Sequence, residues 1–130
     1  IIADAVSLIN NVKATASTKT TSATFVDLDS MTISYTSSFA EKTLIILTAN
    51  IGMSTVALDA EVTIDIDGTD YSLGQIGLNT NTEDGMVALQ TVQNLAAGAH
   101  TIKGQWRRAA GTGTAEALAR QMSVLRILKG

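Results

Sequence analysis

The 130-residue chain contains neither cysteine nor proline. Without cysteine it can form no disulfide, bind no metal through thiolates and offer no cysteine nucleophile. Without proline it lacks one of the residues that most directly block pairing at the edge of a β-sheet. Any exposed sheet edge must therefore be protected in another way, for example by neighbouring subunits.

Charged residues are scarce, at 16% of the chain against about a quarter in typical soluble domains. The net charge is −3, and apart from Arg107 and Arg108 the basic residues are scattered, so the basic face that nucleic-acid binding requires is absent. The longest apolar run, TLIILTA at 43–49, has the length of a strand and not of a membrane span. We therefore expect no nucleic-acid partner and no membrane insertion. A surface with so little charge is rich in Thr and Ser or partly covered by other subunits.

The chain is rich in short β-branched segments separated by Gly, Asn and Asp, a pattern typical of antiparallel strands. Apolar and polar residues alternate over 31–35 and again over 61–66. Asp67-Gly68 follows the second segment and is a dipeptide preferred in type I′ hairpin turns. The segment KTLIILTANI at 42–51 is almost continuously apolar, which predicts a strand covered on both sides.

The segment from His100 to Arg107 alternates in the same way, and its parity puts Trp106 on the apolar face as a core anchor. The residues AAGTGT at 109–114 predict a reversal of the chain. The composition of 113–128 partly favours a helix, but its end is β-branched and no capping box precedes it. We expect a loop or turn over 115–119 and a last strand over 120–128.

About eight short strands, spaced by about 8–12 residues and with no convincing helix, predict an all-β antiparallel sandwich or barrel. The chain is long enough for one domain that buries roughly two-thirds of its unfolded surface. Residues 1–23 differ from the rest, because an apolar start passes into a polar Thr/Ser/Lys segment without strong turns. Two interpretations stay open for them. They form a first strand of the same domain, or an extended N-terminal arm that packs on another subunit through Ile1, Ile2, Val6, Leu8 and Ile9.

Candidate chemical sites are few. His100 has no recognisable nucleophile motif to serve, and the adjacent acids at 83–84 lack the aromatic platform of a typical sugar-cleaving site. Asp65, Asp67 and Asp70 resemble the opening of a calcium loop, but the remaining spacing and the terminal Glu are missing, so a solvated hairpin tip is the default interpretation. The sequence therefore predicts no enzyme and no cofactor.

Three of these segments together resemble a group of phage and prophage virion proteins. The segments are Asp67-Gly68-Thr69, Gly98 to Arg107 and Arg120 to Val124. The group is similar to the tumour-necrosis-factor and C1q jelly rolls, and its members occur as fibre, head-fibre or capsid-decorating modules. The likeness spans about residues 24–128 and implies an antiparallel jelly-roll β-sandwich of about eight strands over 24–130, commonly assembled as a homotrimer.

The resemblance implies a non-enzymatic structural protein on the surface of a virion, with other virion proteins as partners. A second possibility is a fibre tip that binds a host receptor or a carbohydrate through loops 80–84 and 109–114. A third is a subunit of an extracellular filament, in which the N-terminal arm completes the sheet of the next subunit.

Overall fold

The computed structural model describes residues 5–53, 58–78 and 84–128. These residues form antiparallel strands and contain no helix, which confirms the predicted all-β class; accordingly, none of them belongs to a helix that could cross a membrane. The strands are β1 (Ala5–Ala14), β2 (Thr18–Thr20), β3 (Val26–Ser37), β4 (Glu41–Met53), β5 (Leu58–Ile66), β6 (Thr69–Leu78), β7 (Asp84–Leu95), β8 (Gly98–Gly111) and β9 (Ala115–Leu128).

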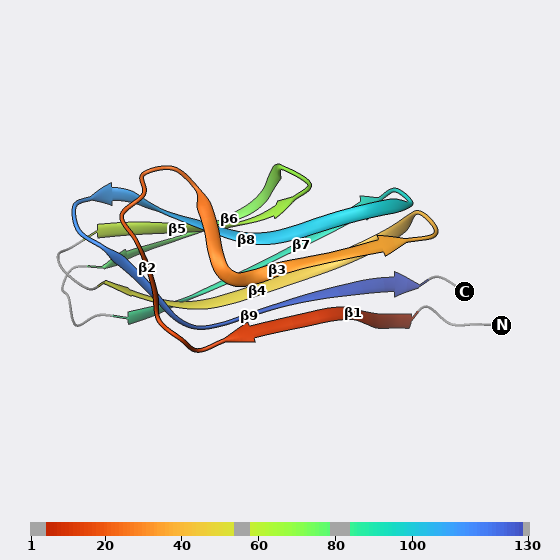
Figure 1. Cartoon of the computed structure of the whole chain (residues 1–130), viewed down its shortest axis with the longest axis horizontal. Helices are drawn as coiled ribbons and strands as arrows, with labels where there is room; N and C mark the ends of the chain where they lie inside the picture. Colours follow the sequence, from red (N-terminus) through yellow and green to blue (C-terminus); the bar gives the residue numbers. More distant parts are fainter. Residues whose placement is uncertain (1–4, 54–57, 79–83, 129–130) are drawn as a thin grey trace.

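The strands form two sheets that pack face to face (Figure 1). One sheet has the order β1-β9-β4-β7, and the other has the order β3-β8-β5-β6. Strand β2 pairs with the first residues of β9, and β1 pairs with the rest of it, so β1 and β2 together occupy one strand position. Two four-strand sheets in this order are the arrangement of a jelly roll, as the sequence predicted.

The core lies between the two sheets. It consists of the side chains at every second position of the strands, which point inward. In β4 these are Ile45, Leu47, Ala49 and Ile51, each at most 1% exposed. Trp106 of β8 is also 1% exposed, so the tryptophan fills the core as its parity predicted. One contiguous cluster of buried apolar residues spans both sheets.

The predicted loop over 115–119 is wrong, because β9 begins at Ala115 and runs without interruption to Leu128. Ala115 and Ala117 are fully buried. They pair with β2 on one side and with the end of β4 on the other. Pairing on both sides outweighs the helix propensity of Ala and Leu, which is only a weak local preference.

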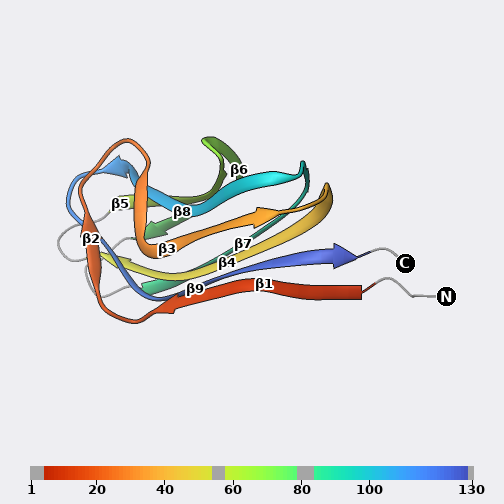
Figure 2. The same cartoon turned by 45° about the vertical axis from the view of Figure 1, so that its right-hand side comes forward.

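Of the two interpretations of residues 1–23, the structure shows the strand for the parts it describes. Residues 5–14 form β1 and pair with β9 of the same chain, and residues 18–20 form β2. Figures 1 and 2 show the chain crossing from β1 over the end of the sandwich to β3 in the other sheet. Ile1 and Ile2 lie outside the described residues.

Arg120 holds this crossing in place. Its side chain is fully buried in the inward face of β9. The guanidinium donates hydrogen bonds to the carbonyl oxygens of Ala16 at 2.7 Å, Leu118 at 2.8 Å and Asp29 at 2.8 Å. The Asp29 carboxylate lies 3.4 Å from it. One cation thus joins the β1–β2 connection to β3 and β9.

Candidate interaction surface

The two sheets present very different outer faces. On the sheet of β1, β9, β4 and β7, the residues that point away from the core are largely aliphatic. We call the following residues the apolar face: Val6, Leu8, Leu44, Ile46, Val92, Leu125 and Ile127. Four of them are substantially exposed, with Val6 at 60%, Leu8 at 58%, Val92 at 49% and Ile46 at 36%.

Strand register brings the apolar face together. Leu8 pairs with Leu125, Leu125 with Leu44, and Leu44 with Val92, so one aliphatic row crosses the sheet from edge to edge. The row before it contains Val6, Ile127, Lys42 and Asn94, and the row after it contains Asn11, Ser123, Ile46 and Gln90. Lys42 is the only charged side chain in these three rows.

The outer face of the other sheet is largely polar, and its charged side chains form hydrogen bonds and ion pairs with one another. Asp27 accepts hydrogen bonds from Lys103 and Gln105, both at 2.9 Å, and the two donors lower the pKa of its carboxyl group, with Gln105 contributing most. Arg107 pairs with Glu61 at 2.7 Å and lies over the ring of Phe25. A sheet face of this kind is stable in water. The apolar face is the one for which water is a poor partner.

The sequence predicted part of this surface. Val6 and Leu8, expected at a subunit interface, both belong to the apolar face, whereas Ile9 packs against the core next to a bulge in β1. The sequence did not single out Leu44, Ile46, Val92, Leu125 and Ile127. The signal was present in the unbroken apolar run of β4, whose Ile45 and Leu47 fill the core while Leu44 and Ile46 point outward.

His100 connects the β5–β6 turn to the β7–β8 turn through both of its ring nitrogens. Its Nδ1 lies 2.6 Å from the Asp67 carboxylate and its Nε2 lies 2.7 Å from the carbonyl oxygen of Ala96. Both contacts favour the protonated ring, and the hydrogen bond to Asp67 is the largest cause of a raised pKa for His100. Desolvation acts to raise the pKa of Asp67, but the hydrogen bonds from His100 and the Thr101 amide outweigh it and lower that pKa.

The three aspartates of the predicted calcium-loop opening lie at the β5–β6 hairpin. Asp67 and Gly68 have φ angles of 53° and 91°, as a type I′ turn requires. Asp65 accepts a hydrogen bond from the Gly68 amide at 3.0 Å, and burial raises the pKa of its carboxyl group. Among the described residues, no group of three or more potential metal ligands lies close enough to hold an ion. The Asp65 carboxylate binds the Gly68 amide of the hairpin, and the Asp67 carboxylate binds His100 and the Thr101 amide of β8.

The two loops suggested as a ligand site are only partly described. Residues 80–83 lie outside the described residues. In the other loop, Gly111 and Gly113 have positive φ angles, and Arg108 donates a hydrogen bond to the Gly113 carbonyl oxygen at 3.2 Å. The Arg108 amide donates a hydrogen bond to the Ser22 carbonyl oxygen at 2.8 Å, so the end of β8 is joined to the connection between β2 and β3.

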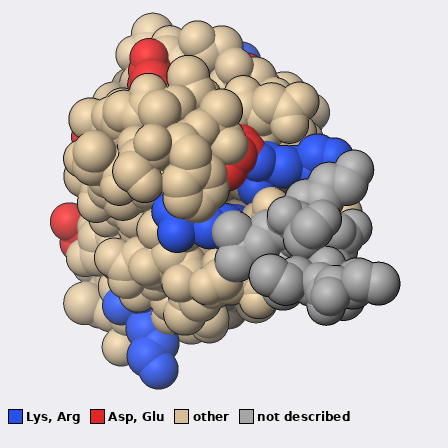
Figure 3. Space-filling view, turned by 90° about the vertical axis from the view of Figure 1, so that its right-hand side faces the viewer, with Lys and Arg blue, Asp and Glu red and all other residues tan. Residues whose placement is uncertain are grey.

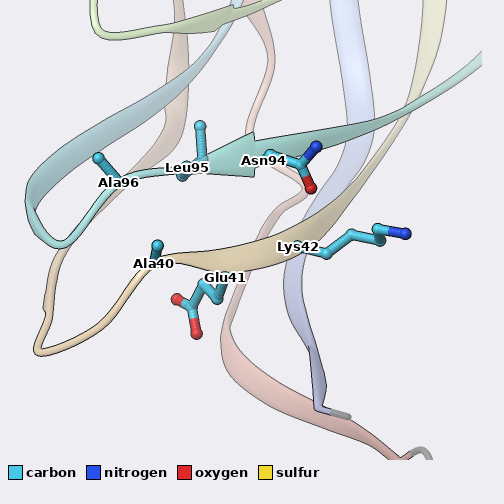
Figure 4. A pocket seen from close by; sticks show the side chains of 6 residues that line it. All are labelled: Ala40, Glu41, Lys42, Asn94, Leu95 and Ala96. Carbon is cyan, nitrogen blue, oxygen red and sulfur yellow. The ribbon is translucent and has the colours of Figure 1, made fainter.

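A shallow hollow of about 350 Å³ lies where β4 begins and β7 ends (Figure 4). Its lining residues are Ala40, Glu41, Lys42, Asn94, Leu95 and Ala96. Glu41 is buried and forms an ion pair with Arg126, which also lies over the ring of the exposed Phe39. At the end of the sandwich that faces the viewer in Figure 3, most of the visible described surface is neither acidic nor basic.

No family model and no curated protein matches the chain. Solved structures do. The structure of infectious bursal disease virus strain Gx matches 98% of this chain with a TM-score of 0.54 at 12% identity, and the VP2 subviral particle of that virus matches 94% with a TM-score of 0.53 at 11% identity. The C-terminal domain of the sugar-binding protein EclA matches 84% with a TM-score of 0.50 at 15% identity.

This chain spans 32% of the length of each viral chain and 78% of the EclA domain chain. At such low identity the comparisons establish the fold, a jelly-roll sandwich, and nothing of its role.

Proposed function

We propose that this chain is a non-enzymatic structural subunit of a virion. It self-associates and attaches to the surface of the particle as a capsid-decorating module or as part of a head or tail fibre. The observation that carries the proposal is the contrast between the two outer faces: one sheet is polar and internally paired, and the other exposes the apolar face.

A subunit that is covered by neighbours on one side is expected to have one apolar outer face and one polar outer face. Solvent-exposed antiparallel sheets normally alternate apolar and polar residues, with the polar ones outward. A contiguous exposed aliphatic patch in a soluble protein marks a contact surface or an aggregation hazard. The expectation of a non-enzymatic role agrees with the contacts of the charged groups, since His100 binds Asp67 and Glu41 pairs with Arg126.

The comparisons support a particle role through the jelly-roll fold that this chain shares with a virus and its subviral particle. The expected count of three copies rests on the resemblance to the virion jelly rolls alone. The filament alternative requires the N-terminal segment to complete the sheet of the next subunit. It is weakened because residues 5–14 pair with β9 of their own chain.

Two measurements test the proposal. Light scattering of the purified chain is expected to give a discrete oligomer, and antibodies against the chain are expected to label the surface of virions from cells that carry its gene. A chain that stays monomeric at every concentration, together with unlabelled virions, would contradict a structural role in the particle.

A carbohydrate-binding fibre tip is the second candidate, and one specific observation favours it. Phe39 is 46% exposed and directly precedes Ala40, which lines the hollow of Figure 4 together with Lys42 and Asn94, two side chains that carry hydrogen-bond donors. An exposed ring beside polar groups suits a sugar, and the EclA domain of similar fold is described as sugar-binding. Binding on a glycan array that is lost in Phe39→Ala would support this role, and an array without signal would exclude the glycans tested.

A further inference from the structure

We infer that the apolar face is covered by the same face of a second copy of this chain, so that two sheets stack with aliphatic row against aliphatic row. The inference rests on the proposed self-association and names its contact surface. The central row has an aliphatic residue in all four strands, from Leu8 at one edge to Val92 at the other. A twofold axis that runs parallel to the strands, between the two stacked sheets, places this row opposite the same row of the second copy. Every residue of the row then meets an aliphatic partner.

The twofold arrangement also specifies which strands meet. Strand β9 of one copy lies over β4 of the other, and β1 lies over β7. Leu125 then faces Leu44 of the second copy, and Leu8 faces its Val92. The contact is isologous, as in most twofold dimers, and is complete with two copies, so it predicts a dimer in place of the trimer that the resemblance implies.

The size of the face suits a specific contact. Four strands about 4.8 Å apart and the stretch of β4 from Lys42 to Asn50, at about 3.3 Å per residue, give the outer face of this sheet an area of roughly 600 Å², of which the three rows of the apolar face form about half. Two such faces bury roughly 1,200 Å², which reaches the lower end of the range for specific protein interfaces.

The charge pattern favours an apolar partner over a polar one. In the three rows that form the apolar face, Lys42 is the only charged side chain. It lies at the start of β4, next to Glu41. In the stack it lies over Ile127 of the second copy and not over another lysine. A glycan or an acidic peptide would leave the aliphatic row without a suitable partner.

A pair of matched substitutions tests the contact. Leu8→Asp places a carboxylate in the proposed interface, and Leu73→Asp places the same charge on β6 of the other sheet. Both leucines are 58% exposed, so the cost to the folded monomer is similar. We expect Leu8→Asp to raise the dissociation constant of the oligomer about 100-fold or more, because an unpaired charge is buried. Leu73→Asp is expected to change it less than about threefold.

Cross-linking gives the geometry independently. The chain has no cysteine, so Leu44→Cys introduces a single thiol near the proposed axis. Packed sheets lie about 10 Å apart, which is too far for a disulfide but within reach of a short bis-maleimide. We expect covalent dimers from Leu44→Cys and none from Leu73→Cys.

The outcomes separate this inference from the proposed function. An oligomer that survives Leu8→Asp, or one in which Leu44→Cys gives no covalent dimer, overturns the face-to-face contact while leaving the structural role intact. A wild-type chain that is monomeric at all concentrations overturns the face-to-face contact, and unlabelled virions in addition overturn the proposed structural role. Weakened assembly in Leu8→Asp with covalent dimers from Leu44→Cys supports the stacked faces.

Discussion

At the scale of single residues, Arg120 joins separate parts of the chain through one buried side chain. It is the only fully buried charged side chain among the ion pairs there, and its guanidinium satisfies three backbone carbonyl oxygens from separate parts of the chain. Asp29, by contrast, is largely exposed, so the carboxylate contributes little. The stabilisation therefore comes from the hydrogen bonds to the carbonyl groups.

Replacing Arg120 by Met keeps the length of the side chain and removes every donor. We expect the free energy of unfolding to fall by about 2–4 kcal/mol, since the carbonyl oxygens lose their partners in a partly buried site. Urea unfolding followed by circular dichroism measures the change. Lys103→Met removes the more exposed ion pair with Asp27 and serves as control, with an expected loss of at most about 1 kcal/mol. Equal losses in the two variants would refute this role of Arg120.

His100 makes stability depend on pH. Both ring nitrogens face an oxygen acceptor, and a neutral imidazole can donate to only one of them. Because the pKa of His100 is raised in the fold, its stabilisation is complete below the unfolded value of about 6.5 and is lost as the pH rises through the folded pKa. The pKa of Asp67 is lowered in the fold, so this carboxylate acts at the acidic end of the pH range. The stability that it contributes is lost as the pH falls through its folded pKa.

We therefore expect the melting temperature of the chain to fall as the pH is raised from about 6 to about 9. The variant His100→Gln, which cannot be protonated, is expected to show a flatter profile over that range. Differential scanning calorimetry at closely spaced pH values measures both. Parallel profiles would mean that the contacts of His100 contribute nothing that depends on protonation.

At the scale of elements, β1 and β2 complete the sheet to which they belong. Ile9 and Val12 pack against the core, and β9 has β1 and β2 as its partners on one side. Deletion of residues 1–20 would remove both strands, leave the edge of β9 unpaired and take away the core contacts of Ile9 and Val12. We expect a loss of at least about 3 kcal/mol from the apolar contacts alone.

The readout is the cooperativity of thermal unfolding by circular dichroism. We expect the truncated chain to melt broadly or to be unfolded at room temperature. A truncated chain with the melting curve of the full chain would show that residues 1–20 are dispensable, as an arm for docking would be.

The sequence predicted the elements with the clearest period and missed those set by their neighbours. The hairpin at Asp67-Gly68 and the part of β8 from His100 to Arg107 follow from alternation and turn chemistry, which are local. Residues 115–119 do not, because their strand exists through pairing with β2 and β4. Distant partners of this kind leave no local pattern. The open choice between an arm and a strand for residues 1–23 has the same cause.

At the scale of the whole molecule, the candidate surface was only half visible in the sequence. Scarce charge predicted a surface that is rich in Thr and Ser or partly covered by other subunits, and the apolar run of β4 predicted a strand covered on both sides. The row from Leu8 to Val92 needs four strands far apart in the sequence and the order β1-β9-β4-β7, which only the topology supplies. The interface residues expected from the N-terminal segment therefore included Val6 and Leu8 but none of their neighbours across the sheet.

The chemical nature of this surface leads to a last prediction, on the response of assembly to solvent. Association through an apolar face should strengthen with sulfate, which favours burial, and weaken in low concentrations of urea. Sodium chloride should have little effect, because it screens charges and only Lys42 carries one in the three central rows. Sedimentation velocity of the wild-type chain in the three solutes measures the oligomer fraction. An assembly that falls apart in sodium chloride would be held by ion pairs, and its contact surface would then lie on the polar sheet around Asp27 and Arg107.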